Sequence, residues 1–338
     1  MRGRALGSAS CEAVVPLGWR SLCQPCGTVS RRMIRFTVLI ALLLSSPMTI
    51  AGDGDRALGA RQVLVLGRVS DDPKAHAESM RPILDYVVPR MRSVGIREGR
   101  ILMARDATQM QSYLRRQRVD WVSDTAAMAI EYRRRIGADL LLVSVRGGAT
   151  YHSVFFTWKG SGIGSLEQLR GRSIAFQNSY STSSYILPAA DLLREGIALD
   201  VLLSPLDRPA AGRAGYLFAR SEGNVVTWVQ KRIVDVGAIS NLDWNDLAQK
   251  PGNPLADLEV FHRSQDVPRS IEVVAPTLDP KVRERLREVL LSAGEDPAAA
   301  EPLRRFFGTQ RFQPIDAQVE RSLAELRAEV DLVRERLE

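Results

Sequence analysis

The sequence predicts an α/β protein of two lobes, each a mainly parallel sheet flanked by helices. The first observation is a regular alternation of short apolar runs with amphipathic segments from residue 62 onward, which is typical of strands joined by helices. The second is a change of pattern at Tyr151, where a second series of strands and helices begins. The third is the apolar run 271–276, which we interpret as a return to the first lobe. Two hinge crossings are therefore expected, near 150 and near 242.

The first 51 residues stand apart from this pattern. An apolar run, 36–44, follows Arg35 and precedes a motif of small residues at 49–51. This arrangement is typical of a secretory signal peptide, and the run is too short for a membrane span. We expect residues 1–51 to be a leader and signal peptide, with the true start at Met33 and a periplasmic mature protein.

Composition excludes several classes of function once this leader is set aside. All three cysteines lie within it, so the "CQPC" pair at 23–26 is not expected to form a redox or metal site. The leader also contains six arginines and one acidic residue, so the 46 basic and 39 acidic residues become 40 and 38 without it. The remaining charge gives no argument for a nucleic-acid partner. The three histidines (His76, His152, His262) are widely spaced, and neither a metal site nor a cofactor is expected.

Segment 60–150 is predicted to be the first part of lobe 1. Strands are expected at 62–69, 100–105, 119–123 and 139–146, and helices at 74–91, 108–116 and 126–136. The helix at 74–91 repeats its apolar residues at the spacing of one helical face. Because strands and helices alternate, the sheet should be mainly parallel, with helices on both faces.

Segment 151–242 is predicted to be lobe 2, and segment 243–338 the return to lobe 1 with C-terminal helices. In lobe 2, strands are expected at 151–158, 173–176, 201–204 and 234–240, with helices near 181–197 and 222–231 and a loop rich in Pro and Gly at 205–215.

A cluster of hydroxyl side chains lies where the strand 173–176 runs into the next helix. The stretch reads "FQNSYSTSSYILP" and places Ser181, Thr182 and Ser183 at the helix start. The first N–H groups of a helix lack partners within it and favour negative charge, so hydroxyl donors at this point suit an oxoanion. The alternative is that one of these serines is only a helix cap.

The stretch from Tyr151 to Pro188 resembles the periplasmic phosphate/phosphite/phosphonate-binding proteins of ABC transporters. The resemblance rests on the Tyr-x-Ser strand, on "SLEQLRGRSIAF" and on the segment 181–184. This segment, "STSS", is called the hydroxyl loop below, and Leu-Pro follows it at 187–188. "VDWVSDTAAM" at 119–128 and "VDVGAIS" at 234–240 resemble two further segments of that family. The resemblance implies a type 2 periplasmic binding protein that captures a phosphonate, phosphite or phosphate between its lobes and delivers it to an ABC permease.

The residues expected to contact the ligand follow from the hydroxyl loop and from the resemblance. They are Ser181, Thr182, Ser183, Tyr180, Tyr151, Asp124, Thr125, Glu222 and Ser240. Tyr180 either lines the cleft or packs against the protein, since tyrosine commonly does both.

The chain departs from the family pattern at four sites. Ser184 stands in place of the loop glycine, Met128 in place of a pocket tyrosine, Glu222 in place of a pocket histidine, and Ser240 with Asn241 in place of an acidic residue. The hydroxyl residues expected to bind the anion are kept, whereas the residues around them differ. The ligand could therefore be something other than a simple phosphonate.

The C-terminal segment repeats apolar residues at a spacing of four and three. They are Val319, Leu323, Leu326, Val330, Val333 and Leu337. This spacing indicates a helix that docks on lobe 1 or, alternatively, forms a weak dimer contact.

Two alternatives to transport remain open. One is a periplasmic sensing module that reports an anion to a membrane signalling protein. The other is an enzyme on the same fold, but the relatives with that role would need a nucleophilic cysteine, and residues 52–338 contain none. The motifs of a serine nucleophile are also missing around Ser181. We therefore expect a binding protein rather than an enzyme.

Overall fold

The computed structural model describes residues 62–337. The predicted signal peptide, the "CQPC" pair and Met33 lie outside the described residues. Between residues 62 and 337, no helix combines the length and the apolar character needed to cross a membrane.

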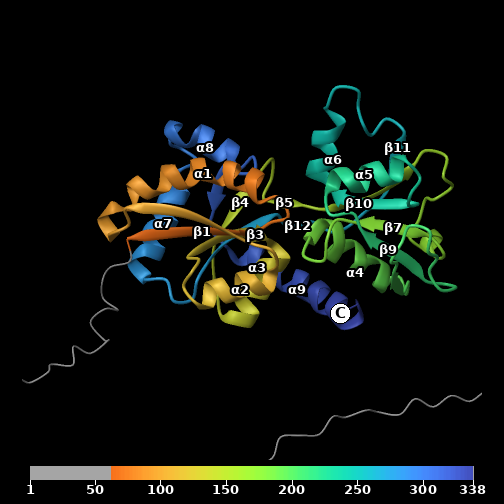
Figure 1. The fold of residues 1–338 in the computed structure, drawn as a ribbon, viewed down its shortest axis with the longest axis horizontal. Coiled ribbons are helices and arrows are strands. Elements are labelled where there is room, and N and C mark those ends of the chain that lie inside the picture. The colour runs from red at the N-terminus through yellow and green to blue at the C-terminus, as the bar shows by residue number, and fades with distance from the viewer. Residues whose placement is uncertain (1–61, 338) are drawn as a thin grey trace, which may run out of the picture. The chain divides into compact units, whose positions relative to one another are not determined.

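Lobe 1 is built on a six-stranded sheet (Figure 1). Its strands are β1 (Val63–Val69), β2 (Glu98–Ala104), β3 (Trp121–Thr125), β4 (Asp139–Val145), β13 (Ser270–Val274) and β14 (Arg311–Gln313). They lie in the order β14-β4-β13-β3-β1-β2. β1 pairs in parallel with β2 and β3, whereas β13 runs antiparallel between β3 and β4. The return strand β13 thus joins the sheet against the direction of its neighbours.

Helices cover both faces of the lobe 1 sheet. They are α1 (Pro73–Arg90), α2 (Ala107–Arg115), α3 (Ala126–Ile136), α7 (Pro280–Ser292) and α8 (Ala300–Arg305), with 3-10 turns at Arg92–Val94 and Pro297–Ala299. Leu64 and Leu66 of β1 share one core with α1, α7 and α8, while Val65 and Val69 share another with α2 and α3. The alternating side chains of β1 therefore reach two helical layers, which explains its continuous apolar run.

Lobe 2 is built on a second six-stranded sheet. Its strands are β6 (Ser153–Trp158), β7 (Ser173–Phe176), β8 (Leu199–Val201), β9 (Ala214–Phe218), β10 (Val236–Ser240) and β11 (Leu258–Arg263), in the order β11-β6-β10-β7-β9-β8. Its helical elements are a 3-10 turn at Glu167–Leu169, a π-helical turn η4 (Thr182–Ile186), α4 (Leu187–Arg194), α5 (Glu222–Gln230) and α6 (Asn241–Ala248). β10, β7, β9 and β8 are parallel neighbours, and β6 is the antiparallel strand.

The chain leaves lobe 2 later than the sequence predicted. The expected crossing near 242 is wrong in position, because β11 pairs antiparallel with β6 and so belongs to the sheet of lobe 2. The return crossing follows at β12 (Val267–Pro268), which pairs antiparallel with β5 (Thr150–Tyr151) between the two sheets (Figure 1). These two short strands are the connections between the lobes.

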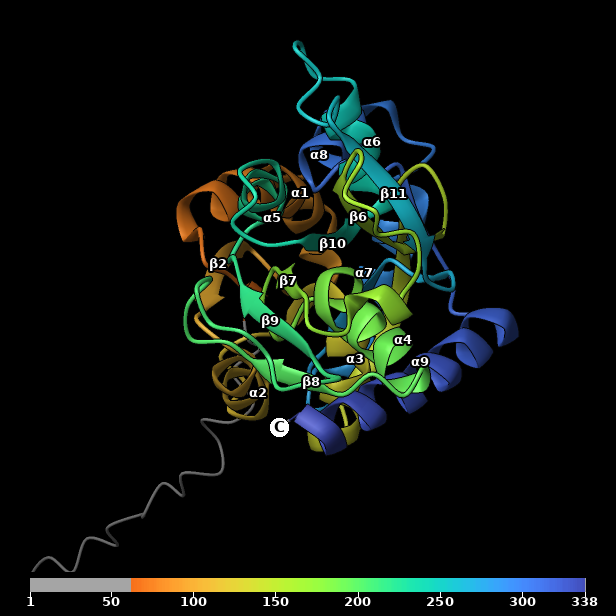
Figure 2. The same ribbon diagram turned by 90° about the vertical axis from the view of Figure 1, so that its right-hand side faces the viewer.

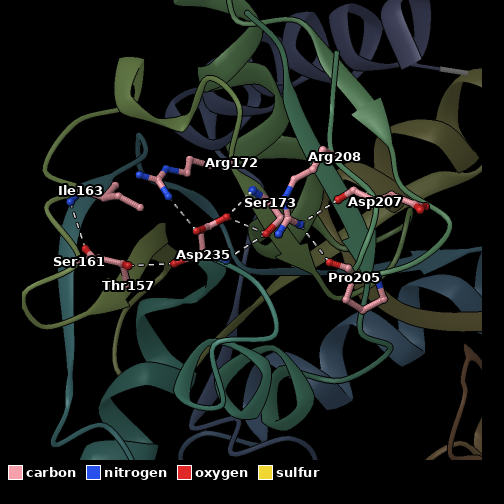
Figure 3. Close-up of polar contacts among 9 residues, drawn as sticks. All are labelled: Thr157, Ser161, Ile163, Arg172, Ser173, Pro205, Asp207, Arg208 and Asp235. Atoms are coloured by element: carbon pink, nitrogen blue, oxygen red, sulfur yellow. Dashed lines mark hydrogen bonds and ion pairs between the residues drawn. The ribbon is translucent and has the colours of Figure 1, made fainter. Parts of the chain in front are cut away.

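Asp235 connects the starts of β7 and β10 with the end of β6 (Figure 3). Its carboxylate accepts hydrogen bonds of 2.9 Å from the backbone N–H and the Oγ of Ser173, and Arg172 lies 3.3 Å from it. Thr157 Oγ1 donates to the Asp235 carbonyl at 2.9 Å. The aspartate of "VDVGAIS" is therefore a structural residue at the end of β7 away from the hydroxyl loop.

The C-terminal helix α9 (Ala317–Leu337) packs against both lobes (Figures 1 and 2). Its apolar seam is buried at Val319, Leu323, Leu326, Val330 and Val333. Glu320 accepts two hydrogen bonds of 2.9 Å from Arg133 of α3, and Glu329 pairs with Arg194 of α4. The seam is thus covered within the chain by both lobes, which corrects the expectation of docking on lobe 1 alone and leaves the dimer contact without support.

Candidate functional site

A cavity of about 280 Å³ lies where the carboxyl ends of strands from both lobes meet. This is the position at which open α/β sheets commonly bind ligands. Eight of the nine residues expected from the sequence line it, and they are Ser181, Ser183, Tyr180, Tyr151, Asp124, Thr125, Glu222 and Ser240. The ninth, Thr182, lies just behind the wall.

The hydroxyl loop is shaped by its own serines. Ser181 Oγ accepts a hydrogen bond of 3.1 Å from the Ser184 N–H and so caps the helix. Ser184 Oγ donates to the Ala238 carbonyl of β10 and accepts from the Gln177 N–H at 3.0 Å. The backbone of Ser184 has φ of −111°, so the loop needs no glycine there. Ser183 is left with its side chain on the cavity wall.

Thr182 connects the two lobes instead of lining the cavity. Its side chain is fully buried, and its Oγ1 accepts a hydrogen bond of 3.2 Å from the N–H of Ala127 in the first turn of α3. The Ser183 carbonyl accepts a further hydrogen bond from Ser153 Oγ. The loop is therefore fixed to lobe 1 at the residue that precedes Ser183.

Two tyrosines lie beside the hydroxyl loop. Tyr151 is buried, and its hydroxyl interacts with Ser183 and Thr182. Burial raises the pKa of Tyr151 to about 12 and that of Tyr180 to about 12. Both phenols are therefore neutral near pH 7 and can donate hydrogen bonds.

Asp124 and Thr125 form the adjacent corner of lobe 1. Asp124 accepts hydrogen bonds of 2.8 Å from the Thr125 N–H and from the Tyr132 hydroxyl, so both carboxylate oxygens have protein partners. Burial raises the pKa of Asp124, which shows that its charged form is poorly solvated there. Met128, in the first turn of α3, is buried and is not among the residues that line the cavity.

An acidic wall faces this corner from lobe 2. Glu222, the first residue of α5, accepts a hydrogen bond of 3.0 Å from Gln177 Nε2. Burial, followed by the charge of Asp243, raises the pKa of Glu222 to about 7. Ser240 Oγ donates to the Asp243 carboxylate at 2.5 Å and accepts from its N–H at 3.0 Å, so Ser240 is the cap of α6.

The sequence reasoning missed three arginines in the cavity wall, Arg68, Arg146 and Arg269. Arg68 and Arg146 lie at the carboxyl ends of β1 and β4, a position that could have identified them. Arg146 pairs with Asp246 of α6 across the lobes. Arg269 follows β12 in the crossing that the sequence misplaced, and burial lowers its pKa.

The histidines do not form a cluster. His76 contacts Ser70, His152 contacts Asp266 and His262 contacts Asp191, each in a different region. From residue 62 to residue 337, no group of three or more His, Cys, Asp or Glu residues is placed to hold a metal ion.

Comparison with known proteins identifies the family. The family model described as "ABC transporter, phosphonate, periplasmic substrate-binding protein" matches residues 69–319. XAC2383 from Xanthomonas citri bound to chloride is 53% identical with a TM-score of 0.78, and the match covers 81% of this chain and 99% of that one. The same protein bound to ATP is 52% identical with a TM-score of 0.77, covering 82% and 100%.

A more distant structure agrees in fold. PhnD1 from Prochlorococcus marinus in complex with methylphosphonate is 15% identical with a TM-score of 0.65, and the match covers 80% of this chain and 98% of that one. At this identity the likeness concerns the fold, and it confirms the predicted type 2 periplasmic binding protein architecture.

The family fixes the general class of activity. Its members are substrate-binding components of transporters and not enzymes, and their name places them outside the cytoplasm. The two lobes, the cavity between their strand ends and the match over residues 69–319 agree with this class. The chain therefore belongs to the family of periplasmic substrate-binding proteins of phosphonate ABC transporters.

Proposed function

We propose that the protein captures a phosphate-like oxoanion, namely a phosphonate, phosphite or phosphate, between its lobes and delivers it to an ABC permease. The observation that carries this proposal is the hydroxyl loop, whose Ser183 side chain lines the cavity at the start of η4 and α4. Backbone N–H groups at this start and the neighbouring hydroxyls are donors for an anion. The neutral phenol of Tyr151 adds a donor beside them.

The ligands of the similar proteins support an anion. XAC2383 was solved with chloride and with ATP, and PhnD1 with methylphosphonate. Chloride, ATP and methylphosphonate share negative charge, and the last two share a phosphorus oxoanion. We infer that the same chemistry attracts the ligand of this chain.

The acidic wall is compatible with such a ligand. A carboxylate next to a dianion is unfavourable unless a proton lies between them. Because the pKa of Glu222 is raised to about 7, its carboxyl can carry that proton near neutral pH and donate a hydrogen bond to the oxoanion. The predicted signal peptide would deliver the protein to the compartment in which such capture takes place.

Isothermal titration calorimetry of the purified mature protein tests the capture. We expect saturable binding of at least one of phosphate, phosphite, methylphosphonate and 2-aminoethylphosphonate, and Ser183→Ala should weaken it. Uncharged methanol and glycerol are the controls. If the protein binds none of the four anions, or if Ser183→Ala binds them as tightly as the parent, the proposed function is wrong.

Delivery needs a separate test. Cells that lack the chromosomal copy should take up the radiolabelled ligand only when the protein is supplied together with its permease. Uptake that does not depend on the protein would contradict delivery while leaving capture intact.

A further inference from the structure

Two buried polar atoms in the lobe 1 wall of the cavity have no hydrogen-bond partner among residues 62–337. They are the Nε of Arg68 and the Oγ1 of Thr125. Buried donors without a partner are rare and cost stability, so each such group calls for an explanation. Arg68 lies on β1 and Thr125 at the end of β3, and these strands are neighbours in the sheet. Both residues thus lie toward the carboxyl ends of neighbouring strands, and both line the cavity that the hydroxyl loop also lines.

The Arg68 side chain is held in place. Its guanidinium lies 4.1 Å from the centre of the Phe307 ring, and its NH1 donates to the Ser123 carbonyl at 3.2 Å. Phe307 has φ of 53°, a left-handed conformation that is unfavourable for a bulky residue. The strained turn presents the ring to Arg68. The guanidinium is therefore oriented before a ligand arrives, which lowers the entropy lost on binding.

The charge of Arg68 acts on the nearby Asp124, whose pKa it lowers against the effect of burial, but the two groups do not pair directly. Among the described residues, no carboxylate oxygen forms an ion pair with Arg68, and both oxygens of Asp124 accept hydrogen bonds from Thr125 and Tyr132. Burial and the charge of Arg68 lower the pKa of the neighbouring His76, so this ring adds no positive charge near pH 7. A positive charge and an unused donor remain for a molecule in the cavity.

Thr125 lies close to the hydroxyl loop. It precedes α3, and the N–H of Ala127 in the first turn of that helix donates to Thr182 Oγ1. Thr182 is followed directly by Ser183, whose side chain lines the same cavity. The hydroxyl of Thr125 and the hydroxyl loop therefore meet at one corner, from opposite lobes.

We propose that Arg68 and Thr125 form the lobe 1 half of the oxoanion site. Arg68 Nε and the Thr125 hydroxyl donate to the anion that Ser183 and its loop hold from lobe 2. The fixed charge of Arg68 makes the protein prefer doubly charged oxoanions to singly charged ones of the same shape. This inference rests on the proposed function. It also explains how lobe 1 binds an anion although Met128 stands in place of the family's tyrosine.

The test compares methylphosphonate with methanesulfonate, two tetrahedral anions of similar shape. Near pH 7, where Glu222 can carry its proton, the first is partly doubly charged and the second carries one charge. Calorimetric titration of the full mature protein should show a clear preference for methylphosphonate. Arg68→Gln should weaken methylphosphonate binding by about ten- to a hundredfold, the range for a lost charge-assisted hydrogen bond, and methanesulfonate binding less. The preference should therefore shrink.

Three further variants complete the set. Arg68→Lys keeps the charge and should keep most of the preference, while Thr125→Val should weaken both ligands by a similar factor of about ten. Arg118→Gln is the matched control, because Arg118 also stacks on an aromatic ring of lobe 1, Tyr113 at 4.7 Å, but lies outside the cavity wall. It should bind like the parent. Circular dichroism and melting temperature confirm that each variant folds.

The outcomes separate this inference from the proposed function. Suppose that Ser183→Ala weakens binding while Arg68→Gln and Thr125→Val bind like the parent. The inference that Arg68 and Thr125 contact the anion is then wrong, and the proposed function stands. If the parent binds neither methylphosphonate nor phosphate, the proposed function itself fails. Should Arg68→Gln not fold, Thr125→Val decides the question, since unchanged affinity in that variant would overturn the inference.

Discussion

Ser181 and Ser183 of the hydroxyl loop have different roles although they carry the same type of side chain. Ser181 accepts from the Ser184 N–H and caps the helix, whereas the Ser183 side chain lines the cavity. Sequence reasoning posed capping and anion binding as alternatives for the whole cluster. The structure divides the two roles between neighbouring positions.

This division predicts opposite effects for two substitutions. Ser181→Ala should lower the free energy of unfolding by about 1 kcal/mol, because a helix cap is lost. Ser183→Ala should leave stability nearly unchanged and weaken oxoanion binding by about ten- to a hundredfold. Urea unfolding and calorimetric titration measure the two quantities. The reverse pattern, with Ser183→Ala unstable and Ser181→Ala unable to bind, would contradict this assignment.

Glu272 is a buried acid whose ionisation should control stability. It is fully buried in β13 and accepts hydrogen bonds from Trp121 Nε1 at 2.5 Å, Ser123 Oγ at 2.9 Å and Ser144 Oγ at 2.5 Å. Burial outweighs these donors and raises the pKa of Glu272 from 4.5 to about 7. The unfolded chain therefore loses this proton at lower pH than the folded protein does.

The sign of the pH effect follows from that order. The stability that Glu272 contributes is fully present below about pH 4.5 and is lost as the pH rises through about 7. At about 1.4 kcal/mol per pKa unit, the free energy of unfolding should fall by about 3 kcal/mol over this range. Urea unfolding between pH 5 and pH 8 should show this decline in the parent and a smaller one in Glu272→Gln, which cannot ionise. Equal declines in the two proteins would show that Glu272 titrates normally.

At the scale of elements, local patterns predicted well and long-range pairing did not. The helix expected at 126–136 has the same bounds in the structure, and that expected at 222–231 ends one residue earlier. In contrast, β9 begins inside the expected loop 205–215, because Pro and Gly residues dominate the approach to it. β11 was missed as well. As an edge strand with half-exposed residues it lacks a clear apolar pattern, and its pairing with β6 depends on residues about a hundred positions earlier.

The same lack of information on long-range pairing explains which residues of the site could be predicted. The hydroxyl loop is contiguous in sequence, so its chemistry is visible there. The three arginines of the cavity wall are far apart in sequence: Arg68 lies on β1, Arg146 follows β4 and Arg269 follows β12. Only the order of the strands in the sheet brings them to one cavity. A single sequence gives the ends of strands but not their order in the sheet.

The helix α9 provides a prediction at the scale of one element. Leu326 is fully buried in the seam that contacts both lobes. Leu326→Ala should lower the free energy of unfolding by about 2–5 kcal/mol, through lost burial and the cavity left behind. Glu325→Ala, at an exposed neighbouring position, is the control and should change stability little.

Size-exclusion chromatography of the same variants tests the dimer alternative. Because the seam is covered within the chain, elution should be the same for the parent and for Leu326→Ala at concentrations where both are folded. A parent dimer that Leu326→Ala dissociates would show that the seam also serves a contact between copies.

For the whole molecule, the lobes are connected in two ways. The chain crosses at β5 and β12, and noncovalent contacts add the Thr182 to Ala127 hydrogen bond and the Arg146 to Asp246 ion pair. The hydrogen bond and the ion pair lie at or near the cavity wall, so these two contacts can form only when the lobes are close together. A ligand that contacts both lobes would stabilise this arrangement over an open one.

Small-angle scattering of the mature protein should therefore show a smaller radius of gyration when a binding oxoanion is added. The ion pair should assist closure, so Asp246→Asn should enlarge the ligand-free particle slightly and weaken affinity by no more than about fivefold, as expected for an exposed pair worth at most about 1 kcal/mol. Ser183→Ala at the same anion concentration is the control, because weaker binding leaves more of the population open. A radius that stays constant while calorimetry proves saturation would mean that the ligand enters without lobe movement, and β5 and β12 would then be connections rather than hinges.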